Sequence, residues 1–199
     1  MIKMQNNQKT YFSYLNSRQW TGLFYRFFFI YPFFLAYLGK DNLDFGCGIG
    51  DFLRFANFFK KRIVGIDINQ FNIAHCRQRG FCVHKISKNY LSKLKKESFD
   101  TVILDNVLEH ILNPHHELCT IKKILRLNGY LIVAIPVGQA GYNADSDHKV
   151  YYDEQSLDRL LNDYAFFRVS DFYRPFKNNY LRKNLRQYCY FAIYKKIEK

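Results

Sequence analysis

The motif LDFGCGIG at 43–50 has the composition of a turn that holds a ligand against the backbone. Its glycines Gly46, Gly48 and Gly50 stand at alternate positions directly after a short apolar run. Glycine lacks a Cβ atom, so a ligand can approach the main chain closely and the chain can adopt positive φ. A nicotinamide dinucleotide site would have the spacing G-x-G-x-x-G, but Asp51 stands where that pattern has its third glycine. The spacing therefore disfavours a dinucleotide fold.

Asp67 is the second element with the chemistry of a nucleotide site. It follows the apolar run VGI at 64–66, where an acid in a βα unit accepts hydrogen bonds from ribose hydroxyls. Capping of a helix at 69–79 is the alternative role for this carboxylate. The glycine motif and Asp67 together are more specific than either alone, because open α/β sheets bind ligands at the carboxyl ends of their strands.

The elements that position these residues alternate between short apolar runs and amphipathic stretches, which is typical of βα units around a parallel sheet. The pattern predicts strands, of which the last two could be antiparallel, at 42–45, 62–66, 81–85, 101–104, 130–135, 166–172 and 187–194. It predicts helices at 52–59, 69–79, 114–127 and 156–164, and a loop at 136–152. We therefore predict one doubly wound, mostly parallel α/β domain at 40–199, preceded by an aromatic-rich helical segment at 1–39.

The composition is that of a globular protein with a strong positive charge. Hydrophobic residues make up 48% and charged residues 24% of the 199 residues, which excludes a largely disordered chain. The formal net charge of +13 implies attraction to nucleic acid, acidic membranes or phosphorylated substrates. From Arg174 onward, eight lysines and arginines accompany a single acid, Glu198. Both a solvated surface and a binding patch fit this concentration of charge.

The cysteines and the N-terminal region bear on the location of the protein. Five cysteines form no CxxC pair and no zinc-ligand spacing, and their odd number favours reduced thiols in the cytoplasm. The apolar segment 23–38 is shorter than the roughly 20 residues of a spanning helix and contains Arg26 and Pro32. We therefore expect no transmembrane helix. The favoured interpretation is an aromatic helix packed over the domain, and contact with a membrane surface or a lipid acceptor is the alternative.

Five motifs occur in an order that points to one enzyme family. They are LDFGCGIG (43–50), VGID (64–67), FDTVILD (99–105), NVLEHI (106–111) and GYLIVAIP (129–136). In this order the chain resembles the class I S-adenosylmethionine-dependent methyltransferases, above all the small-molecule branch with ubiquinone-pathway and surface-polysaccharide-pathway enzymes. The resemblance covers about 40–164. It implies a Rossmann-like, seven-stranded sheet, S-adenosylmethionine as cofactor and S-adenosylhomocysteine as product.

The resemblance also implies which residues bind the cofactor. The methionine part of the cofactor would lie against five residues of the glycine-rich turn, namely Asp44, Gly46, Cys47, Gly48 and Gly50. Asp67 would bind the ribose, Ile68 would flank the adenine, and Asn106 would line the methionine side. Many relatives place an acid after the third strand to bind the adenine amino group. Here the segment offers Ser87 or Asn89 in its place.

Methyl transfer requires alignment of the acceptor and removal of a proton, since the sulfonium is already activated. A general base would be a histidine or carboxylate near the cofactor. Glu109 and His110 follow the fourth predicted strand and His148 lies in the loop after the fifth, so we expect the three to converge. For His110 alone, orientation of the segment after the strand is the favoured role. His115 and His116 have the positions of surface residues at a helix start.

The same three residues could also ligate a metal. The pattern Asn106-x-x-Glu109-His110 with the distant His148 is similar to relatives that bind a divalent metal through E-x-x-E-H. Asn106 replaces the first acid and removes one charged ligand. The sequence therefore leaves a divalent metal open without requiring it.

Three functions are compatible with these residues. The leading hypothesis is O-methylation of a small-molecule, sugar or lipid-linked metabolite, for which an anionic acceptor would suit the basic chain. An RNA methyltransferase with a basic surface is the second hypothesis. Nucleic acid is less favoured because the segment DNVL at 105–108 lacks the Asn/Asp-Pro-Pro-aromatic motif of many amino-adenine methyltransferases. A non-catalytic binding domain is the third hypothesis, and the intact glycine motif with Asp67 argues against it.

Overall fold

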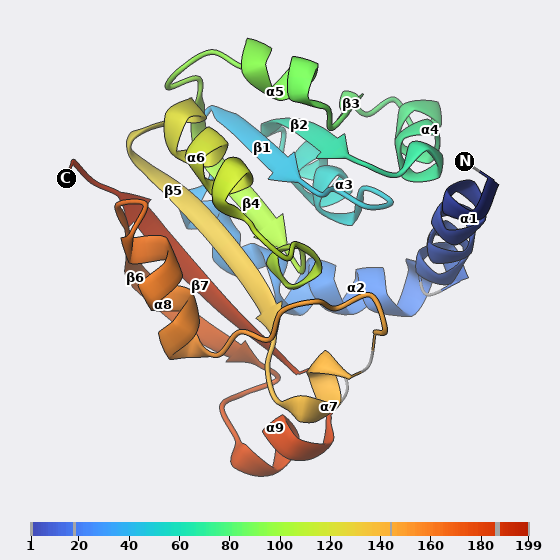
Figure 1. Cartoon of the computed structure of the whole chain (residues 1–199), viewed down its shortest axis with the longest axis vertical. Coiled ribbons are helices and arrows are strands. Elements are labelled where there is room, and N and C mark those ends of the chain that lie inside the picture. The colour runs from blue at the N-terminus through green and yellow to red at the C-terminus, as the bar shows by residue number, and fades with distance from the viewer. Residues whose placement is uncertain (1, 18, 144, 186–187, 199) are drawn as a thin grey trace. The chain divides into compact units, whose positions relative to one another are not determined.

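A computed structural model describes residues 2–17, 19–143, 145–185 and 188–198, and its seven strands form one mostly parallel sheet. The strands follow one another across the sheet in the order β3-β2-β1-β4-β5-β7-β6 (Figure 1). Their bounds are β1 (Asp41–Phe45), β2 (Arg62–Asp67), β3 (Val83–Lys85), β4 (Phe99–Asp105), β5 (Leu125–Pro136), β6 (Phe166–Arg174) and β7 (Cys189–Lys196). This order, with its crossovers, confirms the predicted doubly wound α/β fold.

Helices connect the strands and flank the sheet (Figure 1). They are α1 (Ile2–Ser17), α2 (Gln19–Phe29), α3 (Asp51–Phe58), α4 (Gln70–Gln78), α5 (Lys88–Lys93), α6 (His115–Ile124), α7 (Gln139–Tyr142), α8 (Glu154–Asn162) and α9 (Asn179–Asn184), with the 3₁₀ helices η1 (Tyr31–Tyr37) and η2 (Leu108–His110). The predicted helices at 52–59, 69–79 and 156–164 correspond to α3, α4 and α8. The short helices α5, α7 and α9 were not predicted, because four to six residues span too few turns for a periodic pattern.

The chain divides into two compact units, Met1–Leu94 and Lys95–Lys199. In the first unit β1 pairs in parallel with β2, and β2 pairs in parallel with β3. Gly65 in β2 permits close packing on this sheet. A Cβ atom there would lie 2.9 Å from both the Cys47 Sγ and the Leu53 Cδ1. The glycine of the VGID motif therefore fixes the distance between β2 and the segments that carry these two side chains.

In the second unit β4 pairs in parallel with β5, while β7 runs antiparallel to both β5 and β6, as the sequence suggested. The boundary between α6 and β5 was predicted wrongly. The helix expected at 114–127 ends at Ile124, and β5 begins at Leu125, which pairs with Phe99. Asn128 adopts a φ of 63°, a conformation that asparagine tolerates. Asn128 and Gly129 thus bend the beginning of a strand, and they do not end a helix.

Among the described helices, none combines the length and the hydropathy that crossing a bilayer requires. The apolar segment 23–38 is divided between α2 and η1. Pro32 stands in the first turn of η1, where its fixed φ and missing N–H interrupt the preceding helix.

Candidate active site

The glycine motif forms the turn between β1 and α3 in the first unit. Gly46, Gly48 and Gly50 have φ values of 85°, 51° and 84°, in the left-handed region that favours glycine. The backbone N–H groups of Gly46 and Cys47 both donate to the Ile66 carbonyl, at 2.7 and 3.0 Å. The turn is therefore anchored to β2 and presents a main chain that carries no side chain at alternate positions.

Asp67, the last residue of β2, is buried and joined to this turn by hydrogen bonds. Its Oδ2 accepts from the Gly48 N–H at 2.8 Å and from the Asn72 Nδ2 at 3.4 Å, and its Oδ1 accepts from the Asn69 N–H at 2.7 Å. Burial raises the pKa of Asp67, although these hydrogen bonds favour the carboxylate. Asn69 caps α4 by accepting from the Phe71 N–H, so the alternative role of Asp67 as the helix cap belongs to Asn69.

The other predicted cofactor residues of the first unit differ in exposure. Asp44 is buried in β1, and Cys47 packs its thiol in a core with Leu53 and Cys76. The pKa of the Cys47 thiol is raised, mainly by a hydrogen bond with Cys76 and secondly by burial. Cys47 thus offers a ligand its backbone only. Ile68, directly after Asp67, is 63% exposed and presents an apolar surface.

The two residues considered for an adenine contact lie at the start of α5. The Ser87 hydroxyl caps this helix by accepting from the Tyr90 N–H at 3.1 Å. Asn89 is exposed within the first turn. The Ser87 oxygen therefore already serves as the helix cap. The hydroxyl can still donate one hydrogen bond to a ligand.

Asn106 stands directly after β4 in the second unit, with a φ of 55°. Its Nδ2 donates to the Asp105 Oδ1 at 2.8 Å, and its Oδ1 accepts from the Cys189 Sγ at 3.6 Å. The Asn106 backbone N–H donates to the Ala134 carbonyl at 3.1 Å. Its left-handed conformation, which asparagine tolerates, turns the chain sharply at the strand end and fixes this side chain between β4 and β7.

Glu109, His110 and His148 converge in the second unit, as the sequence suggested. One ligand atom from each lies within 4.8 Å of those of the other two. The His148 Nε2 is 4.0 Å from the Glu109 Oε1, and the imidazole rings of His110 and His148 are centred 4.9 Å apart. The Glu109 side chain is 1% exposed. The Glu109 carbonyl accepts from the N–H groups of Lys149 and Val150, which ties the loop after β5 to η2.

The hydrogen bond of the other ring nitrogen sets the tautomer of His148. Its Nδ1 lies 2.6 Å from the Tyr142 carbonyl oxygen, which can only accept, so Nδ1 carries the proton in the neutral ring. The Nε2 of neutral His148 therefore has a lone pair on the side of Glu109. Tyr142 was not among the predicted site residues. It acts through its backbone carbonyl, which leaves no signal in residue type or spacing.

His110 is held by the same loop and is biased toward its neutral form. Its Nδ1 lies 3.3 Å from the Asp147 carbonyl and 3.5 Å from the Asp147 Oδ2. Burial, and then the neighbouring His148, lowers the pKa of His110 despite the nearby Asp145 and Asp147. His115 and His116, by contrast, are exposed at the start of α6, as expected.

The lowered pKa of His110 makes a testable prediction about stability. Below pH 6.5, the ordinary histidine value, the unfolded chain binds a proton at this position more readily than the folded one. The free energy of unfolding should therefore fall as the pH drops from about 8 to about 5, and more steeply in the wild type than in His110→Gln. Urea unfolding at both pH values measures this. His116→Gln is the control, and equal pH slopes for all three proteins would contradict the assignment.

Comparison with known proteins gives matches over most of the chain. A family described as a methyltransferase domain matches residues 20–188. Comparison with curated proteins gives no significant match.

Among solved structures, three similar chains are described as methyltransferases that depend on S-adenosylmethionine. One from Archaeoglobus fulgidus has a TM-score of 0.69 at 20% identity, covering 89% of this chain and 100% of its own. One from Thermotoga maritima, described as a possible histamine N-methyltransferase, has a TM-score of 0.69 at 19% identity, covering 94% and 98%. One from Methanosarcina mazei has a TM-score of 0.64 at 20% identity, covering 85% and 99%. Likeness at this identity establishes the fold.

Proposed function

The chain belongs to the methyltransferase-domain family, and on that premise we propose that it methylates an oxygen of a small-molecule, sugar or lipid-linked acceptor. As a member of this family it is an S-adenosylmethionine-dependent methyltransferase. The observation that carries the choice of oxygen is the basic Nε2 of His148 beside Glu109. A hydroxyl acceptor must lose a proton on methylation, and a neutral imidazole can take it.

The residues of the first unit fit the cofactor. The positive φ angles of the glycine turn expose the main chain. Among the described residues, a Cβ at Gly48 would meet the Leu15 Cδ1 alone, at 3.7 Å. The Asp67 carboxylate is held at this position by hydrogen bonds from Gly48, Asn69 and Asn72. We assign to it a further hydrogen bond from a ribose hydroxyl, the role of an acid at this place in a βα unit. The exposed Ile68 supplies an apolar surface for the adenine, and the backbone of 44–50 supplies contacts for the methionine part.

The second unit supplies proton removal. Bound S-adenosylmethionine provides an electrophilic methyl group on a positively charged sulfur. Transfer of this methyl group to the acceptor oxygen would leave S-adenosylhomocysteine as the second product. The hydroxyl proton passes to the His148 Nε2, and the Glu109 carboxylate stabilises the resulting imidazolium at a distance of 4.0 Å. The Tyr142 carbonyl keeps the ring oriented throughout. Asn106 is assigned to the methionine side of the cofactor.

The same side chains have the chemistry of a divalent-cation site, since one carboxylate and two imidazoles are common ligands. We assign them to proton transfer, because the proposed reaction needs a base and S-adenosylmethionine needs no Lewis acid for activation. The two assignments predict different responses to chelation. A base-catalysed enzyme keeps its rate in a chelator, whereas a metal-dependent enzyme loses it and regains it when Mg²⁺, Mn²⁺ or Zn²⁺ is added.

We propose a small acceptor and not RNA because two of the eight basic residues near the C-terminus, Arg182 and Lys196, are engaged within the protein. Arg182 forms a bidentate ion pair with Glu154, at 2.6 and 3.0 Å. The Lys196 ammonium is buried and donates to the Leu125 carbonyl at 2.6 Å. Arg186 lies outside the described residues. These contacts support the interpretation of this region as a structural surface.

We further propose that the catalytic domain spans 40–199 and acts in the cytoplasm. The five cysteines are free thiols, which suits a reducing compartment.

The proposed function is tested by product formation. Purified protein with labelled S-adenosylmethionine is incubated with a panel of hydroxylated phenols, sugars and lipid-linked sugars, matched amines, and RNA. We expect S-adenosylhomocysteine to form with a hydroxylated small molecule, and mass spectrometry to place the methyl group on oxygen. Transfer to amines or RNA alone would overturn the proposal while leaving the enzyme class intact.

Asp67→Ala separately tests the part of the proposal that concerns cofactor binding. Loss of a hydrogen bond to a charged acceptor costs about 1.5–3 kcal/mol, so the Kd for S-adenosylhomocysteine should rise roughly 10- to 150-fold. Isothermal calorimetry measures the affinity, and thermal unfolding without ligand shows whether the buried substitution disturbs the fold. Asp67→Asn, which keeps the shape, is the second variant, and Asp163→Ala at an exposed carboxylate is the control. Wild-type affinity in folded Asp67→Ala would remove Asp67 from the site.

A further inference from the structure

The outer face of α2 and η1 is aromatic and exposed. One side of this segment packs into the first unit through Leu23, Ile30, Tyr31 and Phe34, as expected for a helix over the domain. The opposite side carries further large aromatic residues. A helix that is apolar all round is normally buried, so this face has the composition of a surface that something covers.

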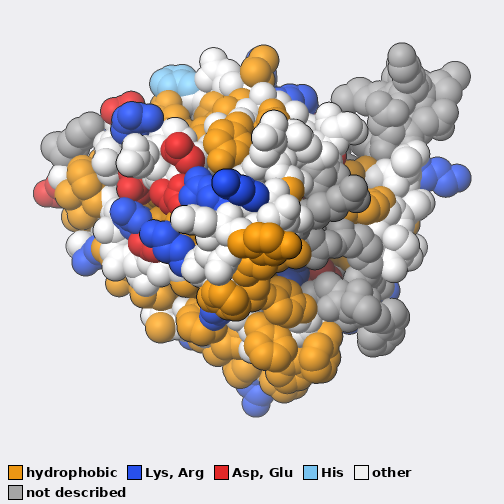
Figure 2. Space-filling view, turned by 90° about the horizontal axis from the view of Figure 1, so that it is seen from below, with side chains coloured by type: hydrophobic (Ala, Val, Ile, Leu, Met, Phe, Trp, Pro, Cys, Tyr) orange, Lys and Arg blue, Asp and Glu red, His pale blue; other side chains and the backbone are white. Residues whose placement is uncertain are grey.

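Five phenylalanines, 50–69% exposed, define what we call the aromatic patch: Phe24, Phe28, Phe29, Phe33 and Phe58. Ring contacts link its parts. Phe24 and Phe28 are 4.7 Å apart between ring centroids, and Phe27 lies 5.3 Å from Phe28 and 5.4 Å from Phe58 at the end of α3. Figure 2 shows hydrophobic side chains gathered over the lower part of its view, on the side where α2 lies. The ring contacts therefore join α2 to α3, and Phe33 adds an exposed ring from η1, which follows α2 in the first unit.

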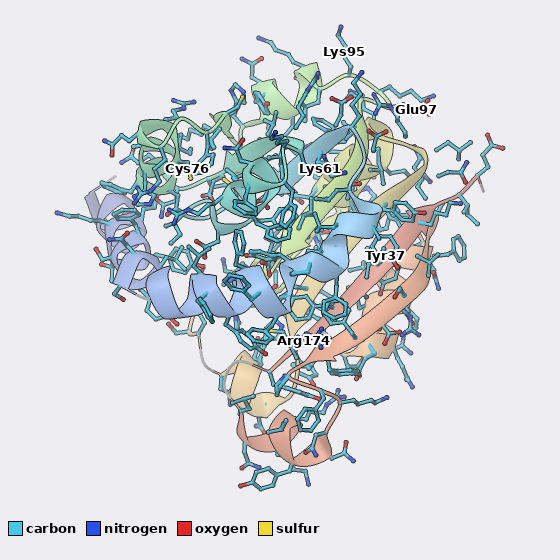
Figure 3. The ribbon with its side chains drawn as sticks, turned by 180° about the vertical axis from the view of Figure 1, so that it is seen from behind. Tyr37, Lys61, Cys76, Lys95, Glu97 and Arg174 are labelled. Atoms are coloured by element: carbon cyan, nitrogen blue, oxygen red, sulfur yellow. The ribbon has the colours of Figure 1, made fainter. Side chains whose placement is uncertain are left out.

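The surroundings of the aromatic patch are basic. Residues 1–40 contain five lysines and arginines and no aspartate or glutamate. Arg26 belongs to α2, and the exposed Lys60 follows the end of α3. Lys61, labelled in Figure 3, donates from Nζ to the Leu38 carbonyl at 3.1 Å and so lies at the end of η1. An occupant of this face thus meets apolar rings within a positive rim.

We propose that the aromatic patch docks on the surface of an anionic lipid bilayer. Helices that lie in a membrane interface insert an apolar face, often aromatic, and direct Lys and Arg toward acidic headgroups. At 11 residues α2 is too short to span a bilayer but can lie flat on it. A second copy of this chain is a poorer occupant, because it would bring another +13 charge against the same basic rim. This docking does not depend on the identity of the methyl acceptor.

Vesicle flotation tests the proposal with the full chain. We expect binding to phosphatidylcholine vesicles containing about 30% phosphatidylglycerol, none to phosphatidylcholine alone, and release at high salt. The double variant Phe24→Gln/Phe28→Gln should bind at least tenfold more weakly, and Lys60→Asn severalfold more weakly. Phe167→Gln/Val169→Gln, which changes two exposed apolar residues of β6, is the matched control and should bind as the wild type does.

Several results would overturn this proposal. They are absence of wild-type binding to the anionic vesicles, unchanged binding of Phe24→Gln/Phe28→Gln, or a lipid-free dimer in sedimentation that this variant abolishes. Thermal unfolding and S-adenosylhomocysteine binding establish that each variant is folded. Should the double variant fail to fold, Phe33→Gln on η1 takes its place with the same expected loss. Failure of docking leaves methyl transfer to soluble acceptors untouched, so the two proposals are distinguished.

Discussion

His148→Ala is expected to lower kcat by 10²- to 10⁴-fold while leaving the Kd for S-adenosylhomocysteine unchanged. A positioned acid–base group contributes an effect of this size. The His148 Nδ1 is held by the Tyr142 carbonyl, and its Nε2 is the basic atom beside Glu109. Removing the ring deletes the proton acceptor without touching the glycine turn. The rate is measured as S-adenosylhomocysteine release with the first hydroxylated acceptor that the wild type accepts.

Three further measurements make this prediction specific. His116→Ala, an exposed histidine of α6, is the matched control and should keep the wild-type rate. Added imidazole should partly restore His148→Ala, because a small base can enter the space that the side chain leaves. The wild-type rate should resist a chelator. Full turnover in His148→Ala would exclude the residue from the reaction. Loss of the wild-type rate in a chelator would indicate that His148 is a metal ligand and not a base.

Gly138→Ala is expected to destabilise the protein by about 3 kcal/mol or more. Gly138 combines a φ of 84° with a ψ of 154°, a region that essentially only glycine occupies. A Cβ atom there would overlap the Arg182 carbonyl oxygen, which is backbone and cannot rotate away. The backbone strain therefore costs about 1–3 kcal/mol, and overpacking against the Arg182 carbonyl adds a cost of similar size. Urea unfolding measures the loss.

Gly80→Ala separates these two costs. Gly80 has a similar φ of 80°, but a Cβ there would meet no atom of the described part of the chain within 4 Å. Its substitution should cost only about 1 kcal/mol, the strain of a left-handed alanine. Equal destabilisation by both substitutions would show that the contact with Arg182 relaxes at little cost. Gly138 is therefore required for close packing of the backbone at the start of α7.

The fold and the glycine-rich turn could be predicted from sequence because their signals are local. Alternation of apolar runs with amphipathic stretches reports strands and helices that each bury one face, and most predicted elements match the structure within two residues. The glycines at 46, 48 and 50 stand where positive φ is needed, and Asp67 follows β2 directly. Positive φ and an acid at the end of β2 are requirements on single positions, so the residue types at those positions reveal them. The start of β5 was missed because Asn128-Gly129 has the same composition whether it ends a helix or bends a strand.

Residue type and spacing placed Glu109, His110 and His148 after the correct strands, but only the tertiary structure decided their chemistry. The tautomer of His148 is set by the carbonyl of Tyr142. Because every residue has a backbone carbonyl, no sequence pattern predicts this contact. The lowered pKa of His110 comes from burial and from His148, 38 positions further along the chain. Likewise, the apolar run at 23–38 predicted an aromatic helix packed over the domain, and only the packing shows which of its aromatic residues face outward. Local conformation is encoded by neighbours in sequence, whereas protonation, distance and exposure depend on neighbours in space.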